Sequence, residues 1–192
     1  MIRVEQLYRT GKQYADQAKN SKYDKLTYDQ VDCQAFCELV LKDIGVRNSK
    51  GVPYNWKGSN DMARNAVSWI GTLDECRQRF GDIPLGSWAF IWENKTGKEK
   101  DRGYYDGKGN YSHVGIYVGQ STVRDSTRYK NSAGEYVRNG PGNRALSAFN
   151  MIGLPKMLDF GGNAEYNETV TISDLFRDIR GMLDTLERMV IQ

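Results

Sequence analysis

Three residues of types used in nucleophilic catalysis are spread along the chain: Cys33, His113 and Asp125. An imidazole can take the proton of a thiol, and a carboxylate can orient the imidazole and stabilise the imidazolium that forms. His113 is the only histidine of the chain, so any imidazole base must be this residue. These residues predict a nucleophile, a base and an orienting acid. Buried structural roles are the competing interpretation for both the thiol and the imidazole.

An apolar stripe at helical spacing begins at Cys33 and predicts a helix over residues 33–44 that ends at Gly45. The stripe consists of Cys33, Phe36, Cys37, Val40, Leu41 and Ile44. A thiol in the first turn of a helix lies beside free backbone N–H groups and the positive end of the helix dipole, and both favour thiolate. Cys37 lies well inside the stripe and is predicted to be core.

His113 and Asp125 fall on two predicted neighbouring strands, residues 113–118 (HVGIYV) and 122–126 (TVRDS). A three-residue turn at 119–121 (GQS) would place both side chains on one face as diagonal neighbours. A two-residue turn would move Asp125 to the opposite face. The expected contact between base and acid therefore depends on the turn.

The other predicted elements surround these two segments. One helix is predicted at residues 2–19, although Gly11 weakens its helical propensity. A second is predicted from Ser59, its N-cap, to Ile70. A third is predicted from Thr72 to Gly81, with Cys76 on its core face. The predicted strands are residues 88–92, 149–154 and 155–160. Residues 93–111 and the segment around 140–142 (GPG) are predicted to be loops.

The end of the chain has a different composition. Residues 1–160 are interpreted as one domain, 161–170 as a linker and 171–192 as an amphipathic helix. Apolar residues recur at a and d heptad positions over residues 172–190, so this helix either docks on the domain or pairs with a copy of itself. Self-association as a homo-oligomer is the favoured alternative.

Composition limits the classes of partner. The chain is 39% hydrophobic and 27% charged, with a net charge of +3, which suits an anionic wall or membrane-adjacent substrate and is too small to indicate nucleic acid. No apolar run approaches the length of a membrane span. The first residues, 1–6 (MIRVEQ), lack the apolar core of a signal peptide, so work outside the cytoplasm would need another route of release.

The cysteines do not indicate a disulfide framework or a metal site. There are three of them, an odd number, and Cys33 and Cys37 share one helix face. Those two have the spacing of paired zinc ligands, but the chain offers only one histidine and a third cysteine, Cys76, predicted to be core. We therefore expect no metal.

Three motifs together resemble the NlpC-type cell-wall cysteine peptidases. They are residues 32–36 (DCQAF), 81–84 (GDIP) before a strand, and 112–119 (SHVGIYVG). The family motifs are Asp-Cys-Ser-Gly-Phe, Gly-Asp-apolar and His-Val-Gly-Ile-Tyr-apolar-Gly, and its third catalytic residue follows the histidine at the separation found for Asp125. The resemblance covers roughly residues 23–160 and is most similar to versions carried by phages and prophages of Gram-positive gut bacteria.

This resemblance implies a papain-like α+β fold, with the cysteine helix packed on an antiparallel sheet. It implies hydrolysis of peptide bonds in peptidoglycan stems, commonly next to D-glutamate, without a cofactor. Cys33 would attack the carbonyl, His113 would shuttle the proton, Asp125 would orient His113, and the Cys33 backbone N–H would help hold the oxyanion. Gly115, which has no Cβ, is expected to let the cysteine helix approach the sheet.

Departures from the family concern the substrate pocket. Gln34 and the alanine after it replace the family's Ser-Gly, and aspartate is a less usual third residue than histidine, asparagine or glutamine. The family's tyrosine ahead of the cysteine has two candidates, Tyr23 and Tyr28, of which Tyr23 is favoured. The expected substrate-binding residues are Tyr23, Asp32 and Gln34.

Two other functions fit the same residues less well. One is an N-acetylmuramoyl-L-alanine amidase of the same fold. The other is an inactive phage tail, assembly or wall-binding module whose C-terminal helix is the working part. In each interpretation the protein is made in the bacterial cytoplasm and reaches the wall by phage-type release or as part of a particle.

Overall fold

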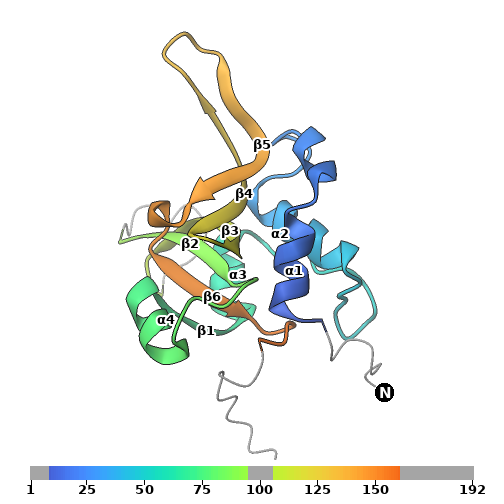
Figure 1. The fold of residues 1–192 in the computed structure, drawn as a ribbon, viewed down its shortest axis with the longest axis vertical. Helices are drawn as coiled ribbons and strands as arrows, with labels where there is room; N and C mark the ends of the chain where they lie inside the picture. Colours follow the sequence, from blue (N-terminus) through green and yellow to red (C-terminus); the bar gives the residue numbers. More distant parts are fainter. Residues whose placement is uncertain (1–8, 95–105, 161–192) are drawn as a thin grey trace, which may run out of the picture. The chain divides into compact units, whose positions relative to one another are not determined.

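The computed structural model describes residues 9–94 and 106–160, which form a mixed α/β arrangement of helices and one antiparallel sheet (Figure 1). The chain divides into two units, Met1–Gly161 and Gly162–Gln192. The linker and the C-terminal helix predicted at 161–192 lie outside the described residues, as does the homo-oligomer contact expected there. In the part of the chain that is described, no helix is long and apolar enough to cross a membrane.

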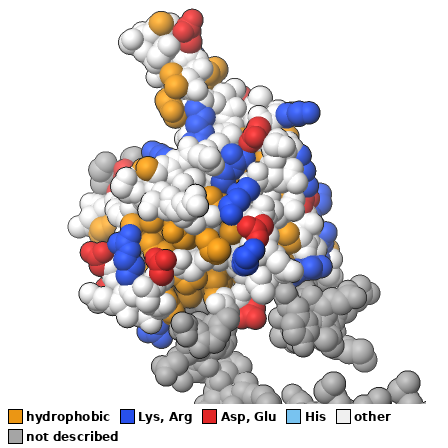
Figure 2. Space-filling model, viewed as in Figure 1, with side chains coloured by type: hydrophobic (Ala, Val, Ile, Leu, Met, Phe, Trp, Pro, Cys, Tyr) orange, Lys and Arg blue, Asp and Glu red, His pale blue; other side chains and the backbone are white. Residues whose placement is uncertain are grey.

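Six strands form the sheet in the order β1-β6-β2-β3-β4-β5, and every neighbouring pair is antiparallel. The strands are β1 (Val67–Thr72), β2 (Trp88–Glu93), β3 (Asn110–Gly119), β4 (Thr122–Lys130), β5 (Tyr136–Ala145) and β6 (Met151–Pro155). The strands expected at 88–92, 113–118 and 122–126 are therefore confirmed, and β4 continues beyond the predicted end. The far part of the β4–β5 hairpin projects with exposed hydrophobic side chains, Tyr129, Tyr136 and Val137 (Figure 2).

Helices pack on the sheet through two separate hydrophobic clusters. The described helices are α1 (Gly11–Ala18), α2 (Cys33–Asp43), α3 (Ser59–Asn65) and α4 (Leu73–Phe80), with short 3-10 turns at Ser21–Lys25 (η2) and Leu146–Ala148 (η3). Helices α1, α2 and α3 contact β3, whereas α4 contacts β1 and β6. Val114, Ile116 and Val118 belong to the first cluster, and Tyr117 and Cys76 to the second. Cys76 is thus core, as predicted.

Helix α2 confirms the prediction made from the apolar stripe. Asp32 caps its first turn by accepting a hydrogen bond from the Ala35 backbone N–H, at 2.8 Å. Ile44 follows the last helical residue, and Gly45 has a positive φ of 81°, the conformation that ends many helices. Cys37 is fully buried, so the stripe positions Cys33 at the start of a helix anchored in the core.

The turn between β3 and β4 differs from the prediction. Gln120 and Ser121 both have positive φ, 51° and 52°, which makes a two-residue turn, and Gly119 pairs with Thr122. A β-bulge then takes up one residue of β3, so that Tyr117 pairs with Val123. The three-residue turn was wrong, but the bulge restores the register that it implied.

Two predicted helices change their boundaries. The helix expected at 59–70 ends at Asn65, and residues 67–72 form β1, because a short apolar run fits a buried strand as well as a helix. Gly58, not Ser59, is the N-cap of α3, and the Ser59 hydroxyl instead donates to the Tyr111 carbonyl at 2.6 Å. The helix expected at 2–19 begins only at Gly11, because Thr10 and Gln13 form a capping box there; residues 2–8 lie outside the described part.

A predicted loop and a predicted pair of strands were also wrong. The segment around residues 140–142 lies inside β5, an edge strand, where the missing N–H of Pro141 interrupts no inner ladder. Residues 149–160 supply one strand, β6, instead of two, and Asp159 makes only an isolated bridge to Thr10. The helix predicted from Thr72 to Gly81 is confirmed as α4, including its Thr72–Glu75 capping box.

Gly11 has a structural reason to be a glycine. A Cβ placed there would lie 2.2 Å from the Leu85 carbonyl oxygen and 2.5 Å from Cε1 of Phe160. Gly86, with a φ of +85°, approaches Gly11 from the other side, since its Cβ would lie 2.2 Å from the Gly11 carbonyl oxygen. The start of α1 therefore packs backbone against backbone on the turn before β2.

We expect Gly11→Ala to lower the free energy of unfolding by about 1–3 kcal/mol, because the added methyl group meets fixed backbone atoms. Helix propensity alone predicts a gain of about 1 kcal/mol. Denaturant unfolding measures whether the variant is destabilised by the steric clash or stabilised by the helix propensity of alanine. Gly51→Ala is the control, since Gly51 has a φ of +76° and no atom near its missing Cβ, so only backbone strain is added. A stabilised Gly11→Ala variant would contradict the close approach.

Candidate active site

Cys33 is the first residue of α2 and is partly exposed. The first-turn N–H groups of a helix have no partner within the helix, so they and the helix dipole make this a favourable place for a thiolate or an oxyanion. Asp32 stands directly before the thiol, but its carboxylate accepts from the Ala35 N–H and serves as the helix cap. The expected substrate-binding role of Asp32 therefore competes with a structural one.

His113 lies on β3 between the thiol and a carboxylate. Its Nε2 atom is 2.5 Å from Oδ2 of Asp125 on β4, and the Cys33 thiol lies near enough to influence the proton affinity of the ring. Since Asp125 occupies Nε2, Nδ1 is the ring nitrogen left for the thiol. The ring stacks on Phe149, with centroids 6.1 Å apart and an interplanar angle of 28°, which restricts its rotation. The predicted proximity of His113 and Asp125 is confirmed.

Asp125 is a buried carboxylate whose side chain is 0% exposed. Burial would raise its pKa, but the hydrogen bond and charge of His113 and the charge of Arg138 outweigh burial and hold the pKa below its usual value. Arg138 Nη2 lies 2.7 Å from Oδ1, and Arg144 Nη1 lies 3.5 Å from Oδ2. Neither arginine was predicted, because their segment was expected to be a loop and nothing local to it indicates pairing with β4.

The same contacts set the proton affinity of His113. Burial alone would lower its pKa, but hydrogen bonds to Asp125 and Cys33, together with their charges, raise the pKa from 6.5 to about 9. A pKa of about 9 favours the imidazolium form of the ring at neutral pH. A thiol beside a proton-donating imidazole is the pairing that thiol catalysis requires, so the arrangement can supply a nucleophile and a proton donor at once.

Gly115 makes room for β4 and not for the cysteine helix, so the predicted reason for this glycine was wrong. A Cβ there would lie 2.5 Å from Cγ1 of Val123, 2.8 Å from Cβ of Asp125 and 3.0 Å from the Arg124 carbonyl oxygen. None of these atoms is the mobile end of a long side chain. The missing Cβ thus lets Asp125 sit across from β3 within reach of His113.

Two of the expected substrate-binding residues are engaged elsewhere. Gln34 donates to the Trp56 carbonyl and, at 2.8 Å, to Oε1 of Glu38, which ties α2 to the loop before α3. The Tyr23 hydroxyl donates to Asp43 at 2.6 Å. Asp43 ends α2, about 15 Å along the helix axis from its first residue. The Tyr23 hydroxyl is therefore held at the end of α2 remote from the thiol.

Tyr28, the other candidate tyrosine, contacts the strand that carries the acid. Its ring packs under the guanidinium of Arg128 on β4, at 5.1 Å. The segment between it and α2 is anchored to the same strand, because Ser126 donates its hydroxyl to the Val31 carbonyl. The Tyr28 ring thus contacts a side chain of the strand that carries Asp125.

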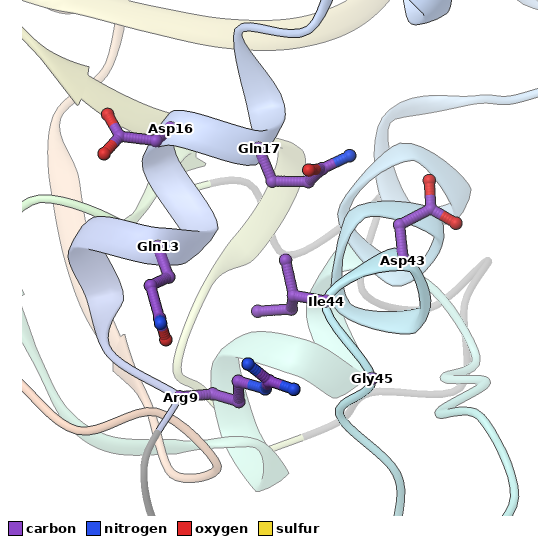
Figure 3. Close-up of a pocket in the computed structure, with 7 residues that line it drawn as sticks. All are labelled: Arg9, Gln13, Asp16, Gln17, Asp43, Ile44 and Gly45. Atoms are coloured by element: carbon purple, nitrogen blue, oxygen red, sulfur yellow. The ribbon is translucent and has the colours of Figure 1, made fainter.

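Two hollows on the described surface are lined by residues other than Cys33, His113 and Asp125. One, of about 580 Å³, lies at the C-terminal end of α2 (Figure 3). Its lining residues are Arg9, Gln13, Asp16, Gln17, Asp43, Ile44 and Gly45. Its two carboxylates already pair with lysines, Asp16 with Lys12 and Lys19, and Asp43 with Lys22. A second hollow, of about 360 Å³, includes Ala35 and Leu39, on the side of α2 away from its buried stripe.

Comparisons with family models, with curated proteins and with solved structures found no match for this chain. Within residues 9–94 and 106–160, no group of three or more His, Cys, Asp or Glu side chains is arranged to hold a metal ion. Cys33, His113 and Asp125 remain the cluster whose geometry fits a reaction, namely attack by a thiolate with proton transfer through an imidazole.

We expect the single histidine signal to titrate near pH 9 in the wild-type protein and at least about one pH unit lower in Asp125→Asn. The amide removes the carboxylate charge, which leaves burial to favour the neutral ring. NMR of the His113 ring measures both midpoints. Asp29→Asn is the control, because this exposed carboxylate pairs with Arg128 on the same strand. An unchanged midpoint in Asp125→Asn would contradict the coupling.

We expect Gly115→Ala to lower the free energy of unfolding by about 1–3 kcal/mol and to shift the His113 midpoint downward, since the methyl group displaces Asp125. Denaturant unfolding and the NMR titration measure the two effects. Gly153→Ala on β6 is the matched control: its Cβ would lie 2.8 Å from Cγ1 of Val67, so it adds strain in the same sheet. It should destabilise the protein without moving the His113 midpoint. A Gly115→Ala variant with the wild-type midpoint would contradict this account.

Proposed function

We propose that this protein is a cysteine peptidase that hydrolyses amide bonds in peptidoglycan stem peptides, next to D-glutamate. The observation that carries the proposal is the imidazole of His113, which is hydrogen-bonded to the buried Asp125 carboxylate and lies near enough to the Cys33 thiol for the two to interact electrostatically. The substrate class rests on the resemblance of residues 32–36, 81–84 and 112–119 to the NlpC-type peptidases. The net charge of +3 is compatible with an anionic wall.

The fold proposed with this function is papain-like. Its support is the packing of α2 against β3 and β4, which places a cysteine at a helix start beside a histidine on an antiparallel sheet. The proposed site of action is the bacterial wall, reached by release at lysis or as part of a phage-type particle. The chemistry needs no cofactor, because thiolate, imidazolium and carboxylate together complete it.

In the proposed reaction the Cys33 thiolate attacks the carbonyl carbon of the scissile amide. The oxygen takes the negative charge and accepts hydrogen bonds from free N–H groups at the start of α2, that of Cys33 included. The His113 imidazolium gives its proton to the leaving amine as the C–N bond breaks, which leaves a thioester on Cys33. Water then attacks the thioester carbonyl while His113 takes a proton from the water. The C–S bond breaks, which releases the carboxylic acid product and restores the Cys33 thiolate.

Asp125 has an orienting part in this sequence. It accepts the Nε2–H of His113, which directs the other ring nitrogen towards the thiol and the leaving group. Its carboxylate stays ionised throughout, because two arginines as well as the imidazolium face it. The proton therefore moves from the imidazolium to the leaving amine, and from the attacking water back to the imidazole, and never to Asp125.

We expect wild-type protein to release stem-peptide fragments with new free amines from isolated Gram-positive peptidoglycan, and Cys33→Ala to lose at least about a thousandfold in rate. Turbidity and mass spectra of the released fragments measure this. Cys76→Ala is the control, since that thiol is buried in the cluster under α4, and it should keep the wild-type rate. Free L-alanine termini with intact stems would indicate the amidase instead. No release from several wall types would contradict the proposal and favour an assembly or wall-binding module.

A further inference from the structure

Arg138 on β5 contacts the candidate triad through its acid. One nitrogen, Nη2, donates to Oδ1 of Asp125 at 2.7 Å, to the Asp125 backbone carbonyl, and to the Gly142 carbonyl at 2.8 Å. Its Nε donates to the Gly140 carbonyl at 3.2 Å. The guanidinium is therefore held by backbone on both strands, and only 13% of the side chain is exposed.

The strand is shaped to receive this guanidinium. Arg138 lies opposite Tyr129 and Gly142 opposite Asp125, so all four positions fall on one face of the β4–β5 ladder. A Cβ on Gly142 would lie 2.9 Å from Arg138 Nε and 3.2 Å from Nη2. A glycine at this position thus leaves the space in which the arginine folds back along its own strand to reach Asp125.

The two carboxylate oxygens of Asp125 are divided between different partners. Oδ1 faces Arg138, and Oδ2 faces His113 at 2.5 Å, with Arg144 farther away at 3.5 Å. The charged and titratable groups around the imidazole are thus Cys33 from α2, Asp125 from β4 and, beyond Asp125, the two arginines from β5. Arg144 is more exposed, at 35%, and its guanidinium also stacks over Phe149. Arg138 is therefore the closer and more buried counter-charge.

We propose that Arg138 is a positioning residue that acts on His113 through Asp125: its charge, held against Oδ1, offsets part of the carboxylate charge that the imidazolium experiences. An uncompensated carboxylate would hold the proton of the imidazolium tightly. A fixed cation on the far side of the acid weakens this effect and makes the imidazolium a better proton donor. The catalytic consequence rests on the proposed thiol chemistry, whereas the electrostatic coupling does not require a substrate.

The test is an NMR titration of His113, the only histidine, in the full-length protein. We expect Arg138→Gln to raise the midpoint by about one pH unit, because a positive charge near the imidazolium is removed while Asp125 remains its partner. Arg138→Lys, which keeps the charge without the guanidinium, should restore part of the difference. Gly142→Ala should shift the midpoint in the same direction as Arg138→Gln, because its methyl group displaces the guanidinium from Asp125.

Arg128→Gln is the matched control, since this arginine lies on the same hairpin but pairs with Asp29, and it should leave the midpoint unchanged. An unchanged or lowered midpoint in folded Arg138→Gln would overturn the proposal. If that variant does not fold, by circular dichroism, Gly142→Ala decides the question by the same criterion. A purely structural role would lower the free energy of unfolding and leave the midpoint in place.

The proposed function and the coupling of Arg138 to His113 are tested by different measurements. Wild-type protein that releases nothing from peptidoglycan would refute the peptidase, while a midpoint shift in Arg138→Gln would still establish the coupling. If wild type is active, the alkaline limb of kcat/KM should move to higher pH in Arg138→Gln, together with the NMR midpoint. A limb that stays in place while the rate falls would overturn the positioning role.

Discussion

The burial of the Asp125 carboxylate is the constraint on which the rest of the site depends. A carboxylate removed from water is costly unless its charge and lone pairs are compensated. Here the compensation comes from His113 on β3 and from Arg138 and Arg144 on β5. These partners can meet the carboxylate only if three strands lie side by side in one register. The glycines at 115 and 142 remove the side chains that would prevent it.

The helical layer depends on a second set of buried polar contacts. The Tyr14 hydroxyl donates to the Cys37 carbonyl at 2.9 Å and accepts from Trp88 Nε1 at 3.1 Å, which joins α1, α2 and β2 in the core. This network lies one helical turn along α2 from Cys33. The position of the Cys33 thiol thus follows from the core packing of α2.

The parts of the fold that were predicted correctly are those with strong local signals. Helix α2 had a full apolar stripe, a capping residue and a terminal glycine, and α4 had a capping box. The parts that were missed have ambiguous or absent signals. Residues 67–72 are too short to separate strand from helix, and β5 contains Pro141 between two glycines, which locally favours a turn. Its pairing with β4 is a long-range interaction that no local pattern encodes.

By itself the sequence determined which residues could react, because only one histidine is present, and it determined that Cys33 begins a helix. The tertiary structure decided which groups surround them. The β-bulge after the two-residue turn kept Asp125 on the His113 side, and the pairing of β5 with β4 brought Arg138 to the carboxylate. The physical reason is that helix signals arise between residues a few positions apart, whereas strand register and charge compensation arise between residues distant in sequence.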